Sequence, residues 1–365
     1  MDSRILTAYT SVFVIMGLSD SVIPILPKLT QDPTISSILF SAYFIGALVA
    51  MLPFGILADR YGNKPFIILS IILTIISGFI LFFSDNIYIM IIARFIEGTA
   101  CAAFFPAAFS MLAQFKKRGK YMGEFNFLIN AGLAAGMCAA GLLAGIHQKG
   151  GILFFTIIAL AVLPISMTMN QCKGQSNAKR TASDSMASQL KSTYNLLFDS
   201  RYGGLWAISF ILFGFTGVIV ASYPEYSITM LSDLQRGIAL GGLYLGAMTM
   251  SLIAGNSSID SRVMIKYGML LTGAGAIVLI LHPVGLVLLG TGSGFAFVGL
   301  VLAVSNFKSD KGAAMGLFNT CTYAGFSVLP VIFSILLPTI GYVGVFTASG
   351  LLLIGGGFLH IHHKG

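Results

Sequence analysis

Residues 91–115 read IIARFIEGTACAAFFPAAFSMLAQF, an apolar stretch with two charged side chains near its start. As a helix, this stretch is long enough to cross the roughly 30 Å of hydrocarbon in a bilayer. Arg94 and Glu97 are three residues apart, so they share one face of such a helix and can interact. A charge inside a membrane is costly unless it faces a partner or a cavity, so these residues form either a structural ion pair or part of a functional site.

The composition of the whole chain agrees with a membrane environment. Of its 365 residues, 56% are hydrophobic and 9% are charged, and the mean hydropathy is +0.89. Soluble domains carry about 25% charged residues, so this chain has too few to cover itself with a water-compatible surface. We therefore predict a polytopic membrane protein.

Apolar runs separated by polar segments predict twelve transmembrane helices. The expected spans are 5–26, 36–57, 64–83, 87–114, 121–146, 150–169, 202–223, 236–256, 263–281, 284–305, 312–337 and 339–361. One long polar segment rich in Ser and Lys, 170–200, predicts a cytoplasmic linker. The expected fold is all-α, with pseudo-symmetric six-helix bundles over 1–169 and 201–365.

The distribution of basic residues predicts the orientation of these helices. With the N-terminus in the cytoplasm, seventeen Lys and Arg residues lie on the cytoplasmic side and three, Lys28, Lys149 and Arg236, on the other. Both termini are then cytoplasmic, and the protein is expected in the cell membrane. The net charge of +8 follows from this topology, and we expect no binding of nucleic acid.

The two predicted halves contain a repeated sequence. RGKYMGEFNFLINAG begins the fifth helix and KGAAMGLFNTCTYAG begins the eleventh. Six residues agree at a constant offset of 193 positions, namely Met122, Gly123, Phe125, Asn126, Ala131 and Gly132 with Met315, Gly316, Phe318, Asn319, Ala324 and Gly325. A duplicated six-helix unit is typical of secondary transporters, in which the substrate site lies between the halves.

The segment GILADRYGNKP, residues 55–65, carries a family resemblance. It resembles the signature G-x-L-A-D-R-x-G-R-K of the major facilitator superfamily, at the place between the second and third helices where that family has it. Asn63 departs from the usual Arg. The resemblance implies a gating loop formed by Gly55, Asp59, Arg60, Gly62 and Lys64. We expect Gly55 to permit close helix approach and Gly62 to permit a tight turn.

Three further stretches resemble patterns of the family's proton-coupled drug exporters. IPILP contains Pro24 and Pro27 at the end of the first helix, and ARFIEGTACAA resembles the fourth-helix pattern R-x-x-Q-G-x-G-A-A. GLAAGMCAAG resembles the exporters' fifth-helix glycine pattern, with Met137 in place of proline. These resemblances imply efflux by antiport with protons.

Two acids and one arginine are the candidate proton-coupling residues: Asp20, Glu97 and Arg94. Asp20 interrupts an apolar span, MGLSDSVIPILP, with no basic residue nearby in sequence. An acid inside a membrane is a functional candidate, because burial in general favours the neutral form of a carboxyl group. We favour Asp20 as the proton carrier, and Glu97 is the second candidate. The alternatives are a buried acid bonded to a helix neighbour for Asp20 and a purely structural ion pair for Arg94 and Glu97.

Aromatic and amide side chains within the predicted spans are candidates for lining a substrate cavity. They are Tyr43, Phe105, Asn126, Asn130, Phe213, Asn319 and Tyr323. Each of them could instead pack between helices or hydrogen bond to a neighbouring helix.

Together these observations predict a transporter that exports a small, partly apolar molecule in exchange for protons. The alternatives are an importer or facilitator of a polar metabolite and a membrane receptor or scaffold that transports nothing. The sequence shows no P-loop and no intramembrane His or Cys cluster with metal-ligand spacing. We expect no enzymatic activity, cofactor or metal, and a monomer whose partners are its substrate, protons and the lipid bilayer.

Overall fold

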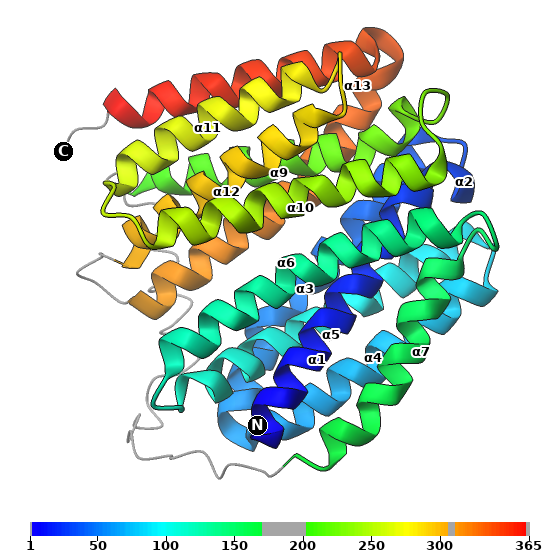
Figure 1. Cartoon of the computed structure of the whole chain (residues 1–365), viewed down its shortest axis with the longest axis vertical. Coiled ribbons are helices and arrows are strands. Elements are labelled where there is room, and N and C mark those ends of the chain that lie inside the picture. Colours follow the sequence, from blue (N-terminus) through cyan, green and yellow to red (C-terminus); the bar gives the residue numbers. More distant parts are fainter. Residues whose placement is uncertain (1, 170–201, 306–310, 363–365) are drawn as a thin grey trace. The chain divides into compact units, whose positions relative to one another are not determined.

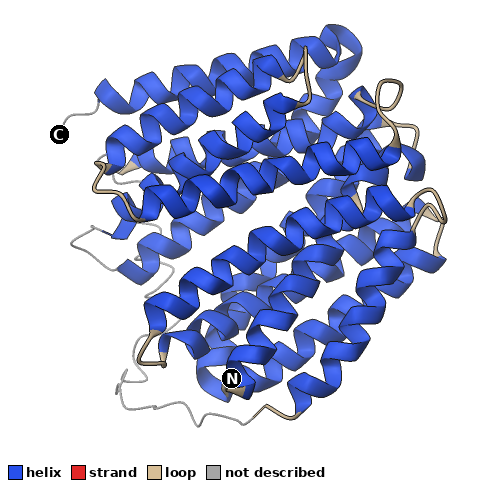
Figure 2. Ribbon diagram, viewed as in Figure 1, coloured by secondary structure: helices blue, strands red, loops and turns tan. Residues whose placement is uncertain are grey.

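The structure is a computed structural model that describes residues 2–169, 202–305 and 311–362 (Figure 1). All regular elements in these ranges are helices (Figure 2). The predicted all-α class is therefore confirmed. The predicted linker, 170–200, lies outside the described residues, and the division into 1–169 and 201–365 stays a prediction.

The first six predicted spans correspond to separate helical segments. The first span is interrupted and consists of α1 (Ser3–Ser21), the short 3₁₀ helix η1 (Ile23–Ile25) and α2 (Leu26–Leu29). The next five are α3 (Pro33–Tyr61), α4 (Asn63–Phe83), α5 (Ile87–Ala113), α6 (Arg118–Leu143) and α7 (Gly150–Met167).

The last six predicted spans form α9 (Gly203–Tyr226), α10 (Asp233–Gly255), α11 (Ser261–Val278), α12 (Val284–Ser305) and α13 (Lys311–His362). Helix α13 covers two of these spans. Gly341, with a φ of 65° and a ψ of 174°, interrupts its helical backbone. Ten stretches of the described chain are long and apolar enough to cross a membrane, one of which, Ala314–Phe358, contains this break. Helix α11, which corresponds to the predicted span 263–281, is not among these ten stretches.

The beginnings of several helices follow from local sequence. The side chains of Asp2, Asp32 and Asn86 each accept a hydrogen bond from a backbone N–H in the first turn of α1, α3 and α5, as helix-capping residues do. The interruption after α1 coincides with Pro24 and Pro27, which have no backbone N–H to continue a helix.

Contacts between helices divide the chain into two compact units. The described residues up to Met169 form the first unit together with Val220–Tyr244, and the remaining described residues form the second. Within the first unit, α3 and α4 pack on α5, α4 packs on α7, and α1 packs on α6 and α7. Within the second, α11 packs on α12 and α13. The outer part of α9 and the first half of α10 thus contact helices of the first predicted half.

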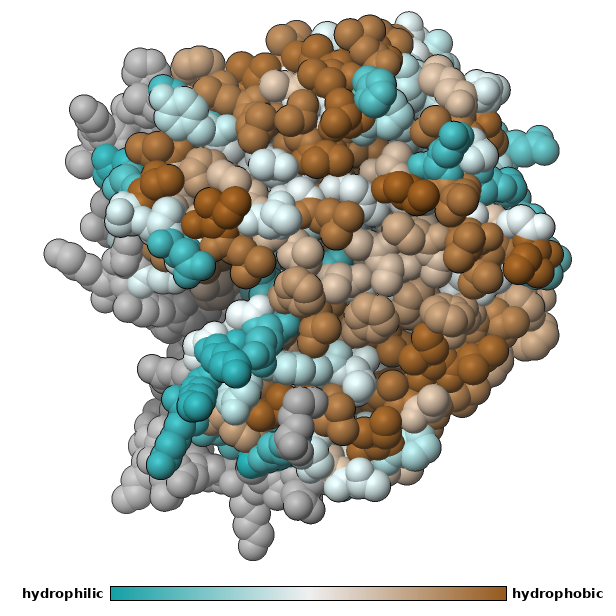
Figure 3. Space-filling view, in the orientation of Figure 1, coloured by the Kyte–Doolittle hydropathy of each residue, from teal (hydrophilic) through white to brown (hydrophobic). Residues whose placement is uncertain are grey.

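The surface agrees with a lipid environment. Apolar side chains cover most of the face in Figure 3, and hydrophilic ones gather chiefly toward the helix ends. Below, the end of the helices that carries the loops after α2, α4, α6 and α9 is called the outer end. The name follows the orientation predicted from the basic residues.

Candidate functional site

Arg94 and Glu97 form an ion pair inside the first unit. The Arg94 Nη1 atom lies 2.7 Å from Glu97 Oε2, and the two side chains are 2% and 0% exposed. Their spacing of three residues along α5 places them on one helix face. The contact predicted from the sequence is therefore present, and it is completely shielded from solvent.

The Arg94 guanidinium also joins α5 to two other helices. Its Nη1 atom donates to the Ser19 carbonyl of α1 at 3.0 Å, and its Nε atom donates to the Leu39 carbonyl of α3 at 3.4 Å. The ring of Tyr43 lies 4.9 Å from the guanidinium carbon, a cation–π contact. Tyr43, which was predicted to line a cavity, is thus buried against the Arg94 guanidinium.

Asp20 lies next to this cluster without forming an ion pair in the described part of the chain. The carboxyl group is buried, and the Ser19 hydroxyl donates to its Oδ1 atom at 3.1 Å. Among the described residues, Asp20 Oδ2 and Glu97 Oε1 have no hydrogen-bond partner. One arginine therefore faces two acids, each with a spare oxygen, and buried polar atoms without partners are uncommon in stable structures.

Tyr244 of α10 is a member of this site that sequence reasoning missed. Its hydroxyl lies close enough to the Asp20 carboxyl to interact with it electrostatically. Both residues belong to the first unit. They are more than 200 positions apart in the sequence, and no spacing or motif connects them, so only helix packing could reveal the contact.

The other predicted cavity residues lie in two separate groups. In the first unit, Phe105 packs against Phe104, Phe109 and Phe125, and the Asn130 amide donates to the Asn126 carbonyl of its own helix. In the second unit, the ring centroids of Phe213 and Phe318 are 6.3 Å apart. Asn319, which follows Phe318 in the sequence, is partly exposed. Tyr323 is also partly exposed. A role of these seven residues in substrate binding stays a prediction.

The predicted gating loop connects α3 and α4. Gly62 ends α3 with a φ of 89°, a conformation that residues with a Cβ rarely adopt. The Lys64 Nζ atom donates to the Met167 carbonyl of α7 at 2.8 Å, and the Arg60 guanidinium lies over the ring of Tyr61. Asp59 belongs to α3 by its backbone, and its side chain lies outside the description.

The expectation for Gly55 was wrong in this structure. A Cβ atom at Gly55 would lie 3.8 Å from Pro106 Cβ, an ordinary contact, so the packing there does not require glycine. Helices α3 and α5 approach most closely elsewhere, at Gly46 and Gly98, where a Cβ would collide with the backbone of the facing helix. The sequence alone contains these two glycines but does not indicate that α3 and α5 cross at them.

Comparisons with known proteins agree with this geometry. The model of the Major Facilitator Superfamily matches residues 6–330. The chain is 25% identical over 335 residues to an uncharacterised MFS-type transporter of Methanocaldococcus jannaschii, covering 87% of this chain and 86% of the relative. It is also 25% identical over 177 residues to the quinolone resistance protein NorA of Staphylococcus aureus, covering 46% of this chain and 45% of NorA.

Solved structures share the fold at low sequence identity. The nucleoside transporter NupG has a TM-score of 0.76 and 14% identity, covering 99% of this chain and 98% of NupG. A POT family transporter in complex with a thioalcohol-conjugated peptide has a TM-score of 0.77 and 13% identity, covering 98% of this chain and 94% of the transporter. At these identities the likeness concerns the fold alone.

Proposed function

The chain belongs to the major facilitator superfamily, and from this premise we propose that it exports a small, partly apolar molecule in exchange for protons. That it is a multi-pass membrane transporter follows from the family and the apolar helices. The direction, the proton coupling and the location in the cell membrane belong to the proposal. So do the cytoplasmic termini, the monomeric state and the absence of enzymatic activity.

The observation that carries the proposal is that the two buried acids, Glu97 and Asp20, have different partners. Glu97 forms an ion pair with Arg94 at 2.7 Å, whereas Asp20 forms no ion pair among the described residues and accepts a hydrogen bond from the neutral Ser19 hydroxyl. A proton carrier must be charged in one state and neutral in another, and loss of water disfavours the charged form. Asp20 therefore suits the carrier role better than Glu97.

Arg94 acts in this scheme as a fixed charge. Arginine stays protonated under all physiological conditions, so it cannot carry the exchanged proton. It can stabilise a charged acid that comes near it, and it loses that influence when helices move apart. Movement of α1 relative to α5 would then change the proton affinity of Asp20, which couples proton binding to conformation.

Export is favoured over import by two similarities. The helix motifs around Pro24, Arg94 and Gly132 resemble those of proton-coupled exporters, and one relative, NorA, is named for quinolone resistance. The alternative, an importer or facilitator of a polar metabolite, is supported by the shared fold with the nucleoside transporter NupG. A receptor or scaffold that transports nothing would not require two buried acids beside one arginine in its membrane-spanning core.

A growth-inhibition survey selects the compound with which to test this function. Cells that express the chain and cells that lack it are compared across a panel of inhibitors that includes quinolones. Export predicts that expression protects against at least one partly apolar compound. If no compound in a broad panel shows protection, the export proposal is wrong and the importer alternative takes its place.

Proton release from the purified protein then tests the coupling. Addition of the selected compound to weakly buffered protein should release protons, and Asp20→Asn should abolish this release. Glu97→Gln is the matched control, because it removes a neighbouring acid and should only weaken the release. Normal release from Asp20→Asn together with no release from Glu97→Gln would reverse the two roles. Normal release from both variants would refute proton exchange through these acids.

A further inference from the structure

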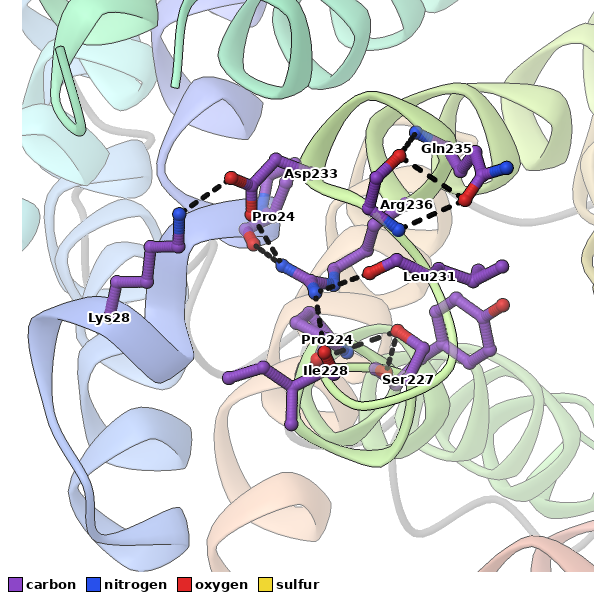
Figure 4. Close-up of polar contacts among 11 residues, drawn as sticks. Pro24, Lys28, Pro224, Ser227, Ile228, Leu231, Asp233, Gln235 and Arg236 are labelled. Carbon is purple, nitrogen blue, oxygen red and sulfur yellow. Dashed lines mark hydrogen bonds and ion pairs between the residues drawn. The ribbon is translucent and has the colours of Figure 1, made fainter. Parts of the chain in front are cut away.

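Asp233 lies between two cations at the outer end of the first unit. The Lys28 Nζ atom donates to Asp233 Oδ2 at 2.6 Å, and Arg236 Nη1 donates to Asp233 Oδ1 at 3.1 Å (Figure 4). Lys28 follows the break in the first span, whereas Asp233 and Arg236 begin α10. One carboxylate therefore connects a helix of the first predicted half with a helix of the second.

Arg236 is buried although it lies near a helix end. The residue is 2% exposed. Its Nη2 atom donates to the Leu231 carbonyl at 3.1 Å and contacts the Ile228 carbonyl at 3.5 Å, and its Nη1 atom contacts the Pro24 carbonyl at 3.5 Å (Figure 4). Its Nε atom has no partner in the described part of the chain. A buried charge is tolerated only with partners, so the burial of Arg236 depends on η1 remaining beside α10.

The proline pair of the first span explains why the Pro24 carbonyl can accept this contact. In η1 and α2, the residue three positions after Pro24 is Pro27, which has no backbone N–H to donate. The carbonyl is thus left without its 3₁₀ donor, and a guanidinium from α10 approaches it. The same break precedes Lys28, so one short segment contributes both a carbonyl and an ammonium group.

Two further contacts join the same regions. The Ser36 hydroxyl of α3 donates to the Glu225 carboxylate of α9 at 2.6 Å. Helices α6 and α10 touch at their backbones, because a Cβ atom on Gly141 would lie 2.5 Å from the Asp233 carbonyl and 3.0 Å from Gly237 Cα. The outer ends of α9 and α10 are therefore held on η1, α2, α3 and α6 both by polar groups and by close packing.

We propose that Lys28, Asp233 and Arg236 form an outer latch, which must open for the outer ends of α10 and α1 to separate during transport. Lys28 lies on α2 and Pro24 on η1, whereas Asp233 and Arg236 both lie on α10. Separation of α10 from this segment therefore breaks the Lys28–Asp233 ion pair and removes the Pro24 carbonyl from Arg236. The Lys28–Asp233 pair is partly exposed, with side chains 34% and 26% exposed. Such partly exposed pairs are weak and can therefore break reversibly. The latch goes beyond the proposed exchange and does not depend on which acid carries the proton.

Cys138 of α6 provides a native reporter of the latch. Its Sγ atom lies 3.9 Å from the Gly237 carbonyl of α10, so α10 covers one side of this partly buried thiol. In a variant with Cys101, Cys172 and Cys321 replaced by Ser, only Cys138 can react with a maleimide. The rate of labelling of the purified protein in nanodiscs then reports how often α10 leaves α6.

Opening of the latch should increase this rate. We expect Lys28→Ala to raise it about 2- to 5-fold, in proportion to a partly exposed ion pair. We expect Asp233→Asn to raise it about tenfold, since both cations lose a charged partner. Lys28→Arg, which keeps the charge, should label at the original rate. Without any latch substitution, 1 M salt should also raise the rate, because salt screens exposed ion pairs.

Asp85→Asn is the matched control for these variants. Lys149 Nζ lies 2.7 Å from Asp85 Oδ1, but this outer ion pair connects segments of the first predicted half only. Its loss should leave labelling within about twofold of the original rate. Original rates in both Lys28→Ala and Asp233→Asn, with no effect of salt on the parent protein, would refute the latch. An equal increase in Asp85→Asn would also refute it, since the effect would then be general loosening.

Discussion

Two arginines, Arg94 and Arg236, are among the largest fully buried side chains of the protein, and their surroundings differ in an instructive way. Each has a carboxylate three residues away on its own helix, Glu97 and Asp233 respectively. Glu97 is completely buried, and a second acid, Asp20, lies nearby with a spare oxygen. Asp233 is partly exposed and is shared with a second cation, Lys28. The same spacing thus occurs with an excess of acid in one place and with an excess of cation in the other.

The difference suggests different roles for the two sites. An excess of buried acid can be relieved by binding a proton, which makes the Arg94 cluster suitable for proton exchange. The Arg236 cluster has a carboxylate with two cations and several backbone carbonyls, so its contacts change when helices separate. We therefore assign chemistry to the first and conformational control to the second, and the following four predictions test that distinction.

Arg94→Leu should have the largest effect on stability. It leaves the Glu97 carboxylate buried without its cation, and removal of one partner from a buried pair costs about 3–5 kcal/mol. The free energy of unfolding in detergent, measured by denaturant titration, checks this. Arg94→Leu/Glu97→Leu should recover most of the loss, because it removes both charges. A double variant as unstable as the single one would show that the ion pair is not the cause.

Arg236→Leu should cost less than Arg94→Leu, about 1–3 kcal/mol in the same titration. The acid that it leaves behind, Asp233, is partly exposed and keeps the Lys28 ammonium at 2.6 Å. Arg236→Lys, which keeps the charge but not the forked donors, should fall between the parent protein and Arg236→Leu. If Arg236→Leu is the more damaging of the two leucine variants, the outer cluster supports the fold more than the central one, and the comparison is reversed.

Lys28→Ala should reduce stability by about 0.2–1 kcal/mol at low salt, and the effect should shrink in 1 M salt. The pair that it breaks is partly exposed, so dissolved ions can screen it. The loss from Arg94→Leu should persist at high salt, because that pair is inaccessible to solvent. Unfolding titrations of both variants at two salt concentrations separate these responses. An equal salt dependence would contradict the assigned difference in burial.

Asp85→Asn should have the smallest effect. The Lys149 ammonium beside Asp85 lowers the pKa of this carboxyl group below 3.8. The stabilisation is therefore present above pH 3.8 and is lost as pH falls through the lower pKa of the folded protein. Because Asp85 is fully exposed, we expect a smaller shift in melting temperature than for Lys28→Ala. Melting curves at pH 7 and at pH 3 check this, and a shift that is larger at pH 3 would contradict the sign.

Many features of the fold could be predicted from neighbouring residues alone. Apolar runs, prolines and capping residues act within a few positions along the chain, so they locate helices without knowledge of packing. The helical regions and the turn at Gly62 follow from such local rules, whereas the break near Pro24 falls inside the predicted span 5–26. The Arg94–Glu97 contact was predictable for the same reason, since residues three apart on a helix must be neighbours.

The remaining contacts of the two sites depended on how helices pack. Lys28 and Asp233 are separated by 205 positions, and neither this pair nor Tyr244 beside Asp20 has a signal in sequence spacing. The sequence analysis used Arg236 only as a basic residue on the outer side, yet it contacts three backbone carbonyls and a carboxylate. Local sequence determined which residues are helical and which side chains share a face. The tertiary structure alone decided which faces meet, because helix-to-helix contacts arise from shape and charge over the whole unit.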